Sequence, residues 1–332
     1  MDGDPQTPEA QVLAFLAEGG DGYTSGEILS GKLGLSRASV WKYVESLRAR
    51  GYTIEALPAR GYRLAGVPDR LSALELLPLL ATRELGQTLH TFEALPSTNA
   101  KAFALATGGA AHGEVVIAEE QTAGKGRRGR TWVSLPGKSL SMSVILRPEL
   151  PPQRASELTL VTAVALAETL AEAGAEVGIK WPNDVQIRGL KVAGILTELS
   201  AEPERVHFVV VGIGVNLNGQ SADFPRELSG QLTSLEAARG QKVSRALFTA
   251  ALLARLEDWF DRHATEGFEP VRQAWKERSS TLGQDVVVHL EQRRIPGRAE
   301  DIDADGALLL RRPDGSVERI VAGDVEHLRP AT

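Results

Sequence analysis

Two stretches of the sequence carry residues suited to chemistry on an anion, and the first is a loop of glycines and cations. It reads GKGRRGR over residues 124–130. Three glycines let the backbone approach a ligand closely, and four cations supply the charge that a phosphate or carboxylate requires. The GxxxxGK[ST] spacing of a P-loop and the helix that follows it are both missing. The loop therefore predicts an anion site, although basic glycine-rich stretches also bind RNA nonspecifically or simply stay solvated.

The second stretch joins the motif KWPND at residues 180–184 to KVAGIL at residues 191–196. Lys191 begins an otherwise apolar strand pattern, where an unpaired cation would be strongly destabilising. It therefore requires a carboxylate partner. That partner is either a ligand or a side chain of the same sheet, in which case the ion pair is structural.

Two shorter motifs place polar groups beside backbone groups that are free to bind a ligand. PSTN at residues 96–99 precedes a helix pattern, so its hydroxyls and amide lie where helix N–H groups point outward. GIGVNLN at residues 212–218 ends a strand pattern, and its glycines allow a nucleotide to approach the backbone. For either motif alone the simpler interpretation is favoured, with Ser97 as a helix N-cap and the glycines as a bend.

These motifs lie in a central segment, residues 67–277, that is expected to form a catalytic α+β domain. Its apolar patterns predict four strands, at residues 114–119, 139–146, 185–199 and 206–215. The third strand folds back at residues 188–189, and a long helix is expected over residues 154–173. Strands grouped around helices, with hairpins, are typical of an α+β sheet domain.

The last segment, residues 278–332, contains only strand and turn patterns. Asp305-Gly306 and Asp314-Gly315 are hairpin signals between apolar runs. We therefore expect a small SH3-like β-barrel as the C-terminal domain.

The first segment, residues 1–66, has the pattern of a winged helix-turn-helix domain. Apolar residues recur at helical spacing over residues 8–18. Ser25 and Ser36 are suitable N-caps for two further helices that meet at the turn after Gly34. The alternating residues 52–64 then predict a β-hairpin, which would be the wing.

Charge is unevenly distributed in this first segment. Residues 1–30 contain six acidic residues and no Lys or Arg, whereas residues 31–66 contain seven basic and two acidic residues. A local basic face favours a polyanion even though the net charge of the chain is −6. The side chains expected to reach DNA are Ser36, Arg37, Ser39, Lys42 and Arg60. The alternative is a helical dimerisation module with a solvated charged face.

Composition excludes several kinds of site. The 332 residues contain no cysteine, which excludes disulfides, thiolate metal sites and a cysteine nucleophile. The six histidines form no HExxH or HxH pattern, so we expect no side-chain metal cage. No apolar run approaches the roughly 20 residues that cross a bilayer, and the N-terminus is acidic and polar. We therefore expect a cytoplasmic protein without membrane contact.

Taken together and in this order, the four motifs resemble those of the biotin protein ligase family. The winged helix makes the whole chain similar to the bifunctional form of that family, the biotin operon repressors. The resemblance implies a central mixed sheet of the class II synthetase kind. It also implies that ATP and Mg²⁺ convert biotin to biotinyl-5′-adenylate, and that biotin passes to a lysine of the biotin carboxyl carrier protein of acetyl-CoA carboxylase.

The resemblance also implies roles for individual residues. Those for biotin are Ser97, Thr98, Asn99, Gln121, Lys125, Gly126, Arg127, Lys191 and Gly194. Those for ATP and the adenylate are Arg127, Arg130, Trp132, Asn183 and Asn216. Lys191 and Arg127 would neutralise the reacting oxygens, and Asp184 would orient or deprotonate the acceptor amine. The family loop usually reads GRGRRGR, so Lys125 is a departure that removes a bidentate fork and predicts a looser hold on the intermediate.

The same resemblance implies a mode of regulation, and three rival functions stand beside it. The adenylate-bound form would be a homodimer that pairs two winged helices on palindromic operator DNA and represses biotin genes. The loop would be disordered without ligand and would close over the adenylate. The rivals are a lipoate protein ligase, a ligand-sensing transcription regulator without ligase activity, and a monofunctional ligase with a vestigial first domain.

Overall fold

The computed structural model describes residues 7–228 and 230–328, which belong to two compact units. The first unit is Met1–Leu79 and the second is Leu80–Thr332. Each unit is described by itself.

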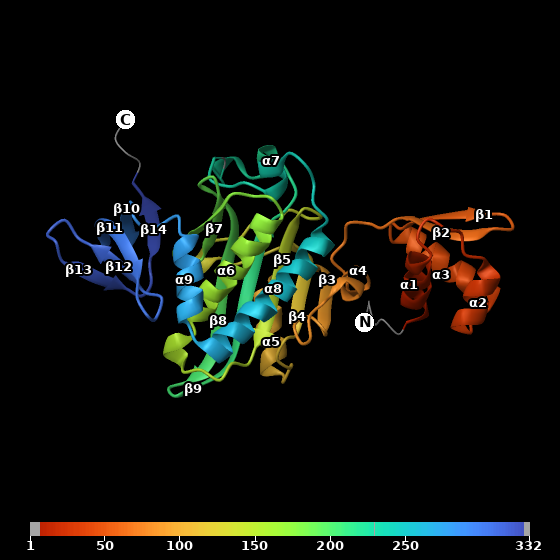
Figure 1. Ribbon diagram of the computed structural model, residues 1–332, viewed down its shortest axis with the longest axis horizontal. Helices are drawn as coiled ribbons and strands as arrows, with labels where there is room; N and C mark the ends of the chain where they lie inside the picture. The colour runs from red at the N-terminus through yellow and green to blue at the C-terminus, as the bar shows by residue number, and fades with distance from the viewer. Residues whose placement is uncertain (1–6, 229, 329–332) are drawn as a thin grey trace. The chain divides into compact units, whose positions relative to one another are not determined.

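The first unit contains three helices followed by a hairpin, as the sequence predicts (Figure 1). Its elements are α1 (Pro8–Glu18), α2 (Gly26–Leu33), α3 (Arg37–Ala49), β1 (Thr53–Leu57), β2 (Gly61–Gly66) and the short α4 (Ala73–Leu76). The Ser25 and Ser36 hydroxyls cap α2 and α3 by accepting backbone N–H bonds of 3.2 and 3.1 Å. Gly34 ends α2 with φ +65°, a conformation that glycine adopts without strain. The winged helix-turn-helix prediction is confirmed.

Helix α4 is packed into the core of this first unit. Leu74 lies in the same buried cluster as Val12, Val44 and Leu47. Beside it, the Tyr52 hydroxyl donates a buried 2.5 Å hydrogen bond to Glu75. Burial and that carboxylate both raise the pKa of Tyr52. The unit therefore includes α4, while the division of the chain at residues 66 and 277 remains a prediction.

A seven-stranded mixed sheet forms the centre of the second unit. Its strands are β3 (Leu89–Leu95), β4 (Val115–Gln121), β5 (Ser139–Leu146), β6 (Val177–Lys180), β7 (Asp184–Ile187), β8 (Leu190–Glu202) and β9 (Arg205–Asn216). The order is β3-β4-β5-β9-β8-β7-β6, and only the β3–β4 pair is parallel among the described strands. The predicted mixed sheet is confirmed, and the hairpin at residues 188–189 joins β7 to β8.

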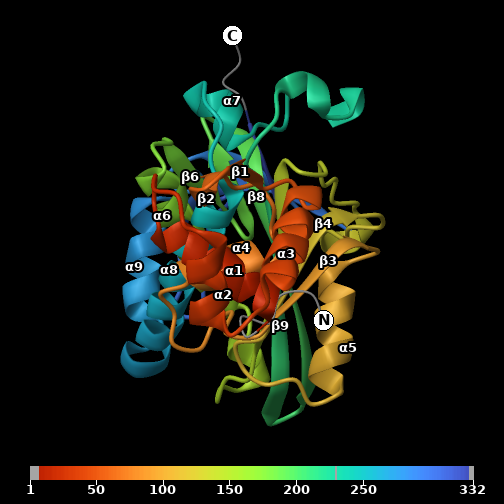
Figure 2. The ribbon, with the colours of Figure 1, turned by 90° about the vertical axis from the view of Figure 1, so that its right-hand side faces the viewer.

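Helices cover both faces of this sheet: α5 (Thr98–Thr107), α6 (Glu157–Glu172), α8 (Arg245–Glu266) and α9 (Glu269–Glu277). The short helix α7 (Leu235–Arg239) lies beyond one end of the strands. In Figure 2, α6, α8 and α9 lie on one face and α5 on the other. Strand β5 is buried along its whole length and turns Ser143 and Ile145 toward α5. None of the helices in the described part of the chain has the length and apolar character needed to cross a membrane.

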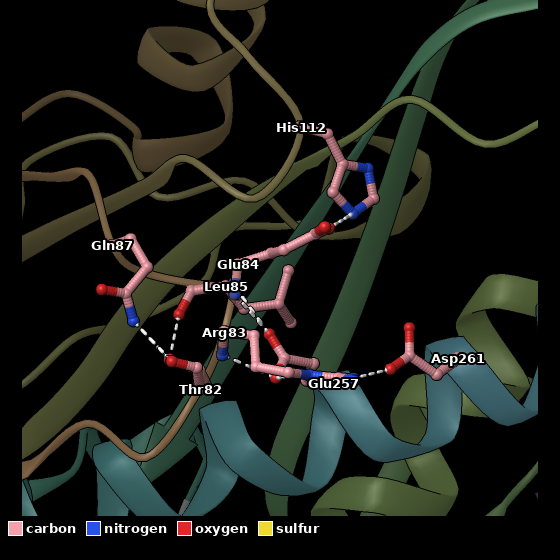
Figure 3. A network of polar contacts seen from close by, with 8 residues as sticks. All are labelled: Thr82, Arg83, Glu84, Leu85, Gln87, His112, Glu257 and Asp261. Atoms are coloured by element: carbon pink, nitrogen blue, oxygen red, sulfur yellow. Dashed lines mark hydrogen bonds and ion pairs between the residues drawn. The ribbon is translucent and has the colours of Figure 1, made fainter.

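A carboxylate on α8 holds the first turn of the second unit (Figure 3). Glu257 accepts backbone N–H bonds of 2.8, 2.8 and 2.9 Å from Arg83, Glu84 and Leu85. The Arg83 side chain also pairs with Asp261, one turn further along α8. These bonds tie the start of the unit to a helix about 170 residues away in sequence.

The C-terminal part of the second unit is a five-stranded antiparallel sheet. Its strands are β10 (Asp285–His289), β11 (Arg294–Ile302), β12 (Leu308–Arg311), β13 (Val317–Ile320) and β14 (Asp324–His327). The order β13-β12-β11-β10-β14 shows no pairing between the two outer strands in the described residues, so the sheet is not closed there. The hairpins at Asp305-Gly306 and Asp314-Gly315 are confirmed, and the arrangement is compatible with the expected SH3-like domain.

Candidate active site

A pocket of about 1290 Å³ opens beside the central sheet of the second unit. The parts of the chain that line it include the start of α5, the loop after β4, the strands β5 to β9, the segment that follows β9, and the strands β10 and β14. All of the residues expected to bind biotin or ATP line this pocket: Ser97, Thr98, Asn99, Gln121, Lys125, Gly126, Arg127, Arg130, Trp132, Asn183, Lys191, Gly194 and Asn216. Asp184 lines it as well. The geometry thus brings the four sequence motifs together.

The start of α5 is fixed by Gln121, the last residue of β4. Gln121 Oε1 accepts from the Thr98 backbone N–H at 2.8 Å and from the Thr98 hydroxyl at 3.1 Å. Ser97 is buried and its hydroxyl caps α5 by accepting from the N–H of Ala100 at 3.4 Å. The N-cap interpretation of Ser97 therefore holds, and it leaves Ser97 beside the pocket.

Asn99 is held by a polar network under the pocket. Ser143 of β5 donates to Asn99 Oδ1 at 2.7 Å, and Asn99 Nδ2 donates to the Leu196 carbonyl at 3.1 Å and to Glu198 at 2.8 Å. A Cβ atom at Gly212 would lie only 2.0 Å from Asn99 Oδ1. The glycine in GIGVNLN thus makes room for a side chain of the site, a role beyond the simple bend.

The glycine-arginine loop doubles back on itself. The N–H of Gly126 donates to the Arg130 carbonyl at 2.7 Å, and the N–H of Trp132 donates to the Gly124 carbonyl at 2.9 Å. Arg128, at the tip, has φ +54°, which is uncommon for a side chain of this size. A Cβ at Gly124 would lie 2.5 Å from the Trp132 carbonyl oxygen. The close approach of Gly124 and Trp132 at the base of the loop therefore requires glycine at position 124.

Asp324 of β14 faces all three arginines of this loop. Its carboxylate lies 2.8 Å from Arg130, 3.6 Å from Arg127 and 3.6 Å from Arg128. The carboxylate therefore occupies the position of an anion among the cations of the loop. Asp324 could not be predicted from the sequence, because 194 residues separate it from Arg130 and no motif surrounds it.

Arg127 points from the loop into the pocket. Its guanidinium donates to Asn183 Oδ1 at 3.1 Å and to the Gly323 carbonyl at 3.2 Å. Burial lowers the pKa of Arg127, and Asp324 opposes that shift. Burial of a guanidinium is favourable only with an anion or several acceptors nearby, so this position suits a charged ligand.

Lys191 has the carboxylate partner that the sequence requires. Its Nζ lies 2.6 Å from Asp184 Oδ1 on the neighbouring strand, and 5.7 Å from the centre of the Trp132 ring. A Cβ at Gly194 would lie 3.1 Å from the same ammonium group. The partner is therefore a side chain of the same sheet, and both residues of the ion pair line the pocket.

Two polar atoms in the nucleotide-binding candidates are buried without a hydrogen-bond partner. They are Trp132 Nε1 and Asn216 Oδ1. The Trp132 indole lies over Gly214, where a Cβ would be 2.4 Å from the ring. Asn183 and Asn216 also donate to main-chain carbonyls, of Ile195 at 2.9 Å and of Thr233 at 3.2 Å. A ligand with a donor for Asn216 and an acceptor for Trp132 would complete these bonds.

Lys180 and His327 line the pocket and were given no role by the sequence. Burial lowers the pKa of Lys180, with the charge of Lys191 adding to the shift and Asp184 opposing it. Burial also lowers the pKa of His327, as does the nearby Lys180. Lys180 could have been identified from its place in the KWPND motif. His327, on β14, belongs to no recognisable motif.

The residues expected to bind DNA lie on the first unit. Ser36 and Ser39 bond to each other at the start of α3 through hydroxyls 2.9 Å apart. Arg37 is 2.9 Å from Glu27 of α2, and both side chains are largely exposed. Lys42 is exposed, and the Arg60 guanidinium on the wing stacks 4.9 Å from the centre of the Tyr23 ring. Trp41, which no sequence motif identifies, lies on α3 between Arg37 and Lys42.

Three protein families match successive parts of the chain. The HTH domain family matches residues 9–63, the biotin/lipoate A/B protein ligase family residues 92–216, and the biotin protein ligase C terminal domain family residues 281–328. Each match lies within one of the three segments distinguished in the sequence. These matches and the mixed-sheet pocket define the class of the protein, a ligase with a helix-turn-helix domain.

Relatives that match almost the whole chain are named as both ligases and repressors. The bifunctional ligase/repressor BirA of Bacillus subtilis is 40% identical over 96% of this chain and 98% of its own length. The protein of the same name from Escherichia coli is 32% identical over 96% of this chain and 97% of its own. Among solved structures, the biotin protein ligase of Aquifex aeolicus in complex with biotin and ATP superposes with a TM-score of 0.63 at 26% identity, over 73% of this chain and 99% of that one. The chain therefore belongs to the biotin protein ligase family, in its bifunctional ligase/repressor branch.

Proposed function

We propose that this chain activates biotin with ATP and transfers it to a lysine of the biotin carboxyl carrier protein of acetyl-CoA carboxylase. One observation carries the proposal: the polar floor around Asn99 and the cations Lys191 and Arg127 lie in a single pocket. That pocket offers hydrogen-bonding groups for a neutral polar ring system and cations for a negatively charged phosphoanhydride. Membership of the biotin protein ligase family supports the same reaction.

In the first half-reaction, a biotin carboxylate oxygen attacks the α-phosphorus of ATP. A bond to that phosphorus forms, the bond to the bridging oxygen breaks, and pyrophosphate leaves with the bonding electrons. Both reactants are anionic, so charge neutralisation and alignment by Lys191, Arg127 and Lys125 supply most of the catalysis. The ammonium group of Lys125 cannot make the bidentate hydrogen bonds that a guanidinium group makes, so we expect weaker binding of the adenylate intermediate.

Individual ligand contacts are part of the proposal. Biotin contacts Ser97, Thr98, Asn99, Gln121, Lys125, Gly126, Arg127, Lys191 and Gly194. ATP and the adenylate contact Arg127, Arg130, Trp132, Asn183 and Asn216. Their common position around one pocket supports this assignment.

Mg²⁺ would arrive with the triphosphate of ATP. The described residues contain no group of three or more His, Cys, Asp or Glu side chains placed to hold a metal ion. Phosphate-bound Mg²⁺ needs only one or two protein carboxylates, and it would supply further neutralisation of the triphosphate charge. In this proposal the phosphates of ATP hold the ion, and no side chain is assigned to it.

In the second half-reaction, the ε-amine of the acceptor lysine attacks the carbonyl carbon of the mixed anhydride. An amide bond forms, the bond from that carbon to the phosphate oxygen breaks, and AMP leaves. The amine must lose a proton, and Asp184 is the carboxylate proposed to accept it or to orient the amine. The ion pair with Lys191 places Asp184 beside the cation expected at the reacting oxygens.

Regulation is the second part of the proposal. We infer that the first unit binds operator DNA through Ser36, Arg37, Ser39, Lys42 and Arg60, and that the adenylate-bound form does so as a homodimer. The helix-turn-helix match and the bifunctional relatives support repression in response to biotin. A three-domain chain, divided at residues 66 and 277, and a cytoplasmic location complete the proposal.

Isotope exchange between pyrophosphate and ATP tests the first half-reaction without any acceptor protein. We expect exchange that requires biotin and Mg²⁺ and does not occur with lipoate. Exchange with lipoate alone would instead support the rival lipoate ligase, and exchange with neither acid would favour a ligand sensor. DNase footprinting with and without biotin and ATP tests repression, and a footprint independent of biotin would contradict the corepressor role.

A further inference from the structure

Trp41 is an exposed aromatic side chain on α3 of the first unit. It is 58% exposed, whereas Trp181, Trp259 and Trp275 are buried. The inner face of α3 is built from Val40, Val44 and Leu47, so the fold of the unit does not use the indole ring. Tryptophan is among the more buried residue types on average, and it is enriched where proteins bind partners.

Two basic side chains flank Trp41 on α3. Lys42 directly follows it, and Arg37, which is 2.9 Å from Glu27 of α2, lies one helical turn before it; all three side chains are exposed. The first turn of α3 contains no acidic residue. The nearest acid on the helix, Glu45, is paired with Arg48 at 2.6 Å. The chemistry that complements this surface is therefore that of a polyanion with an apolar part for the ring to contact.

The position of Trp41 along α3 indicates which part of a DNA duplex its ring would contact. It is the fifth residue of α3, the second helix of the helix-turn-helix pair. In such domains the N-terminal residues of the second helix contact base edges in the major groove, whereas basic side chains contact phosphates. An uncharged ring gains little from a phosphate. Its contribution must come from an apolar feature of a base, and the thymine methyl group is the one that the major groove presents.

We propose that Trp41 contacts a thymine methyl group in each half-site and is a sequence-determining residue of the DNA-binding unit. This inference rests on the proposed binding of operator DNA. The two neighbouring side chains then have different roles in DNA binding. Lys42 increases the affinity for DNA of any sequence, and Trp41 determines which bases are preferred.

The test is selection from a library of DNA duplexes with a randomised centre, in the presence of biotin, ATP and Mg²⁺. Full-length wild type, Trp41→Ala, Trp41→Phe and Lys42→Ala are compared. Val317→Ala is the matched control, because Val317 is also an exposed apolar residue (49%) but lies in the second unit. Circular dichroism and thermal unfolding of each variant verify that it is folded.

For Trp41→Ala we expect the wild-type duplex to bind about 10- to 100-fold more weakly and the preference for thymine at one position per half-site to disappear. The salt dependence of binding should stay unchanged, because no charge is removed. Trp41→Phe should keep the preference with reduced affinity. Lys42→Ala should weaken binding to all duplexes alike and lower the salt slope by about one.

Three results would overturn the inference. The first is that Trp41→Ala selects the same sequences as wild type with affinity within about twofold. The second is that acrylamide quenching of tryptophan fluorescence falls with protein concentration in wild type but not in Trp41→Phe, without DNA, which would assign the surface to a second copy of the chain. The third is that wild type selects no sequence, which would reject operator binding itself and is thereby distinguishable from the first.

Discussion

Lys191 Nζ and Asp184 Oδ1 lie 2.6 Å apart on adjacent strands at the edge of the pocket. The lysine is the cation proposed to act in the first half-reaction, and the aspartate is the carboxylate proposed to act in the second. Because each neutralises the other, a ligand phosphate that draws the lysine away would free the aspartate. One ion pair thus connects the two steps.

Lys191→Met should slow adenylate formation by about 10²- to 10³-fold, because it removes a cation from the reacting oxygens. The readout is single-turnover formation of the adenylate. The double variant Lys191→Met/Asp184→Asn is the control, since it leaves no unpaired carboxylate in the pocket. Adenylate formation within twofold of wild type in Lys191→Met would refute a role for this cation.

Asp184→Asn should separate the two half-reactions. Adenylate formation should change only a few-fold, whereas transfer to the carrier should slow by about 10²-fold or more. Raising the pH should restore part of the transfer rate, because the acceptor amine then loses its proton to solvent. Transfer with an unaltered pH profile would leave Asp184 without the proposed role.

Asp324→Asn should loosen the loop over the pocket, because three arginines lose the carboxylate that faces them. We expect faster tryptic cleavage at residues 127–130 and faster loss of the adenylate to water. Asp285→Asn is a suitable control, as Asp285 is an exposed carboxylate in the same antiparallel sheet, 3.8 Å from Arg298. Equal cleavage of the two variants would mean that Asp324 does not hold the loop.

Alanine at two glycines of β9 should affect different substrates. Gly212→Ala should lower biotin affinity at least tenfold, because the new Cβ would meet Asn99 at 2.0 Å. Gly214→Ala should act mainly on ATP, because its Cβ would meet the Trp132 ring at 2.4 Å. Isothermal titration with each ligand measures both. Gly31→Ala, with no atom within 4 Å of the new Cβ, is the control. Identical losses for the two ligands would argue against separate subsites.

Glu257 should make the stability of the second unit depend on pH. Burial raises the pKa of Glu257, but hydrogen bonds from the backbone of Arg83, Leu85 and Glu84 outweigh burial and lower it below the ordinary 4.5. The stabilising effect of Glu257 is therefore complete above pH 4.5 and is lost as the pH falls through the lowered pKa.

Glu257→Gln should reduce the free energy of unfolding by about 2–4 kcal/mol at pH 7. In acid, the free energies of unfolding of the variant and of wild type should become equal. Urea unfolding at several pH values measures this, with Glu204→Gln as an exposed control; a difference independent of pH would contradict it.

Local signals allowed much of the fold to be predicted. Ser25, Gly34 and Ser36 fix the ends of α2 and α3 through their own backbone neighbours, and the apolar alternation of β5 spans Ser139–Leu146 as expected. Such features depend on residues a few positions apart. They can therefore be recognised without the rest of the chain.

Features that depend on distant residues could not be predicted in this way. Arg245 begins a helix and is 1% exposed, because Glu119, 126 residues earlier, pairs with it at 2.7 Å. Asp324 lies on β14, and its 2.8 Å contact with Arg130 joins residues 194 positions apart. The motif residues of the pocket were identified by resemblance, whereas these partners belong to no motif.

Mass spectrometry of an acceptor domain tests the central claim most directly. The biotin carboxyl carrier domain is incubated with the protein, ATP, Mg²⁺ and either biotin or lipoate, and the intact mass and the modified residue are measured. We expect that one biotinyl group is added to a single lysine, only with biotin and ATP present, and that a carrier with that lysine replaced by arginine stays unmodified. An unmodified wild-type carrier, or one that takes lipoate in place of biotin, would contradict it.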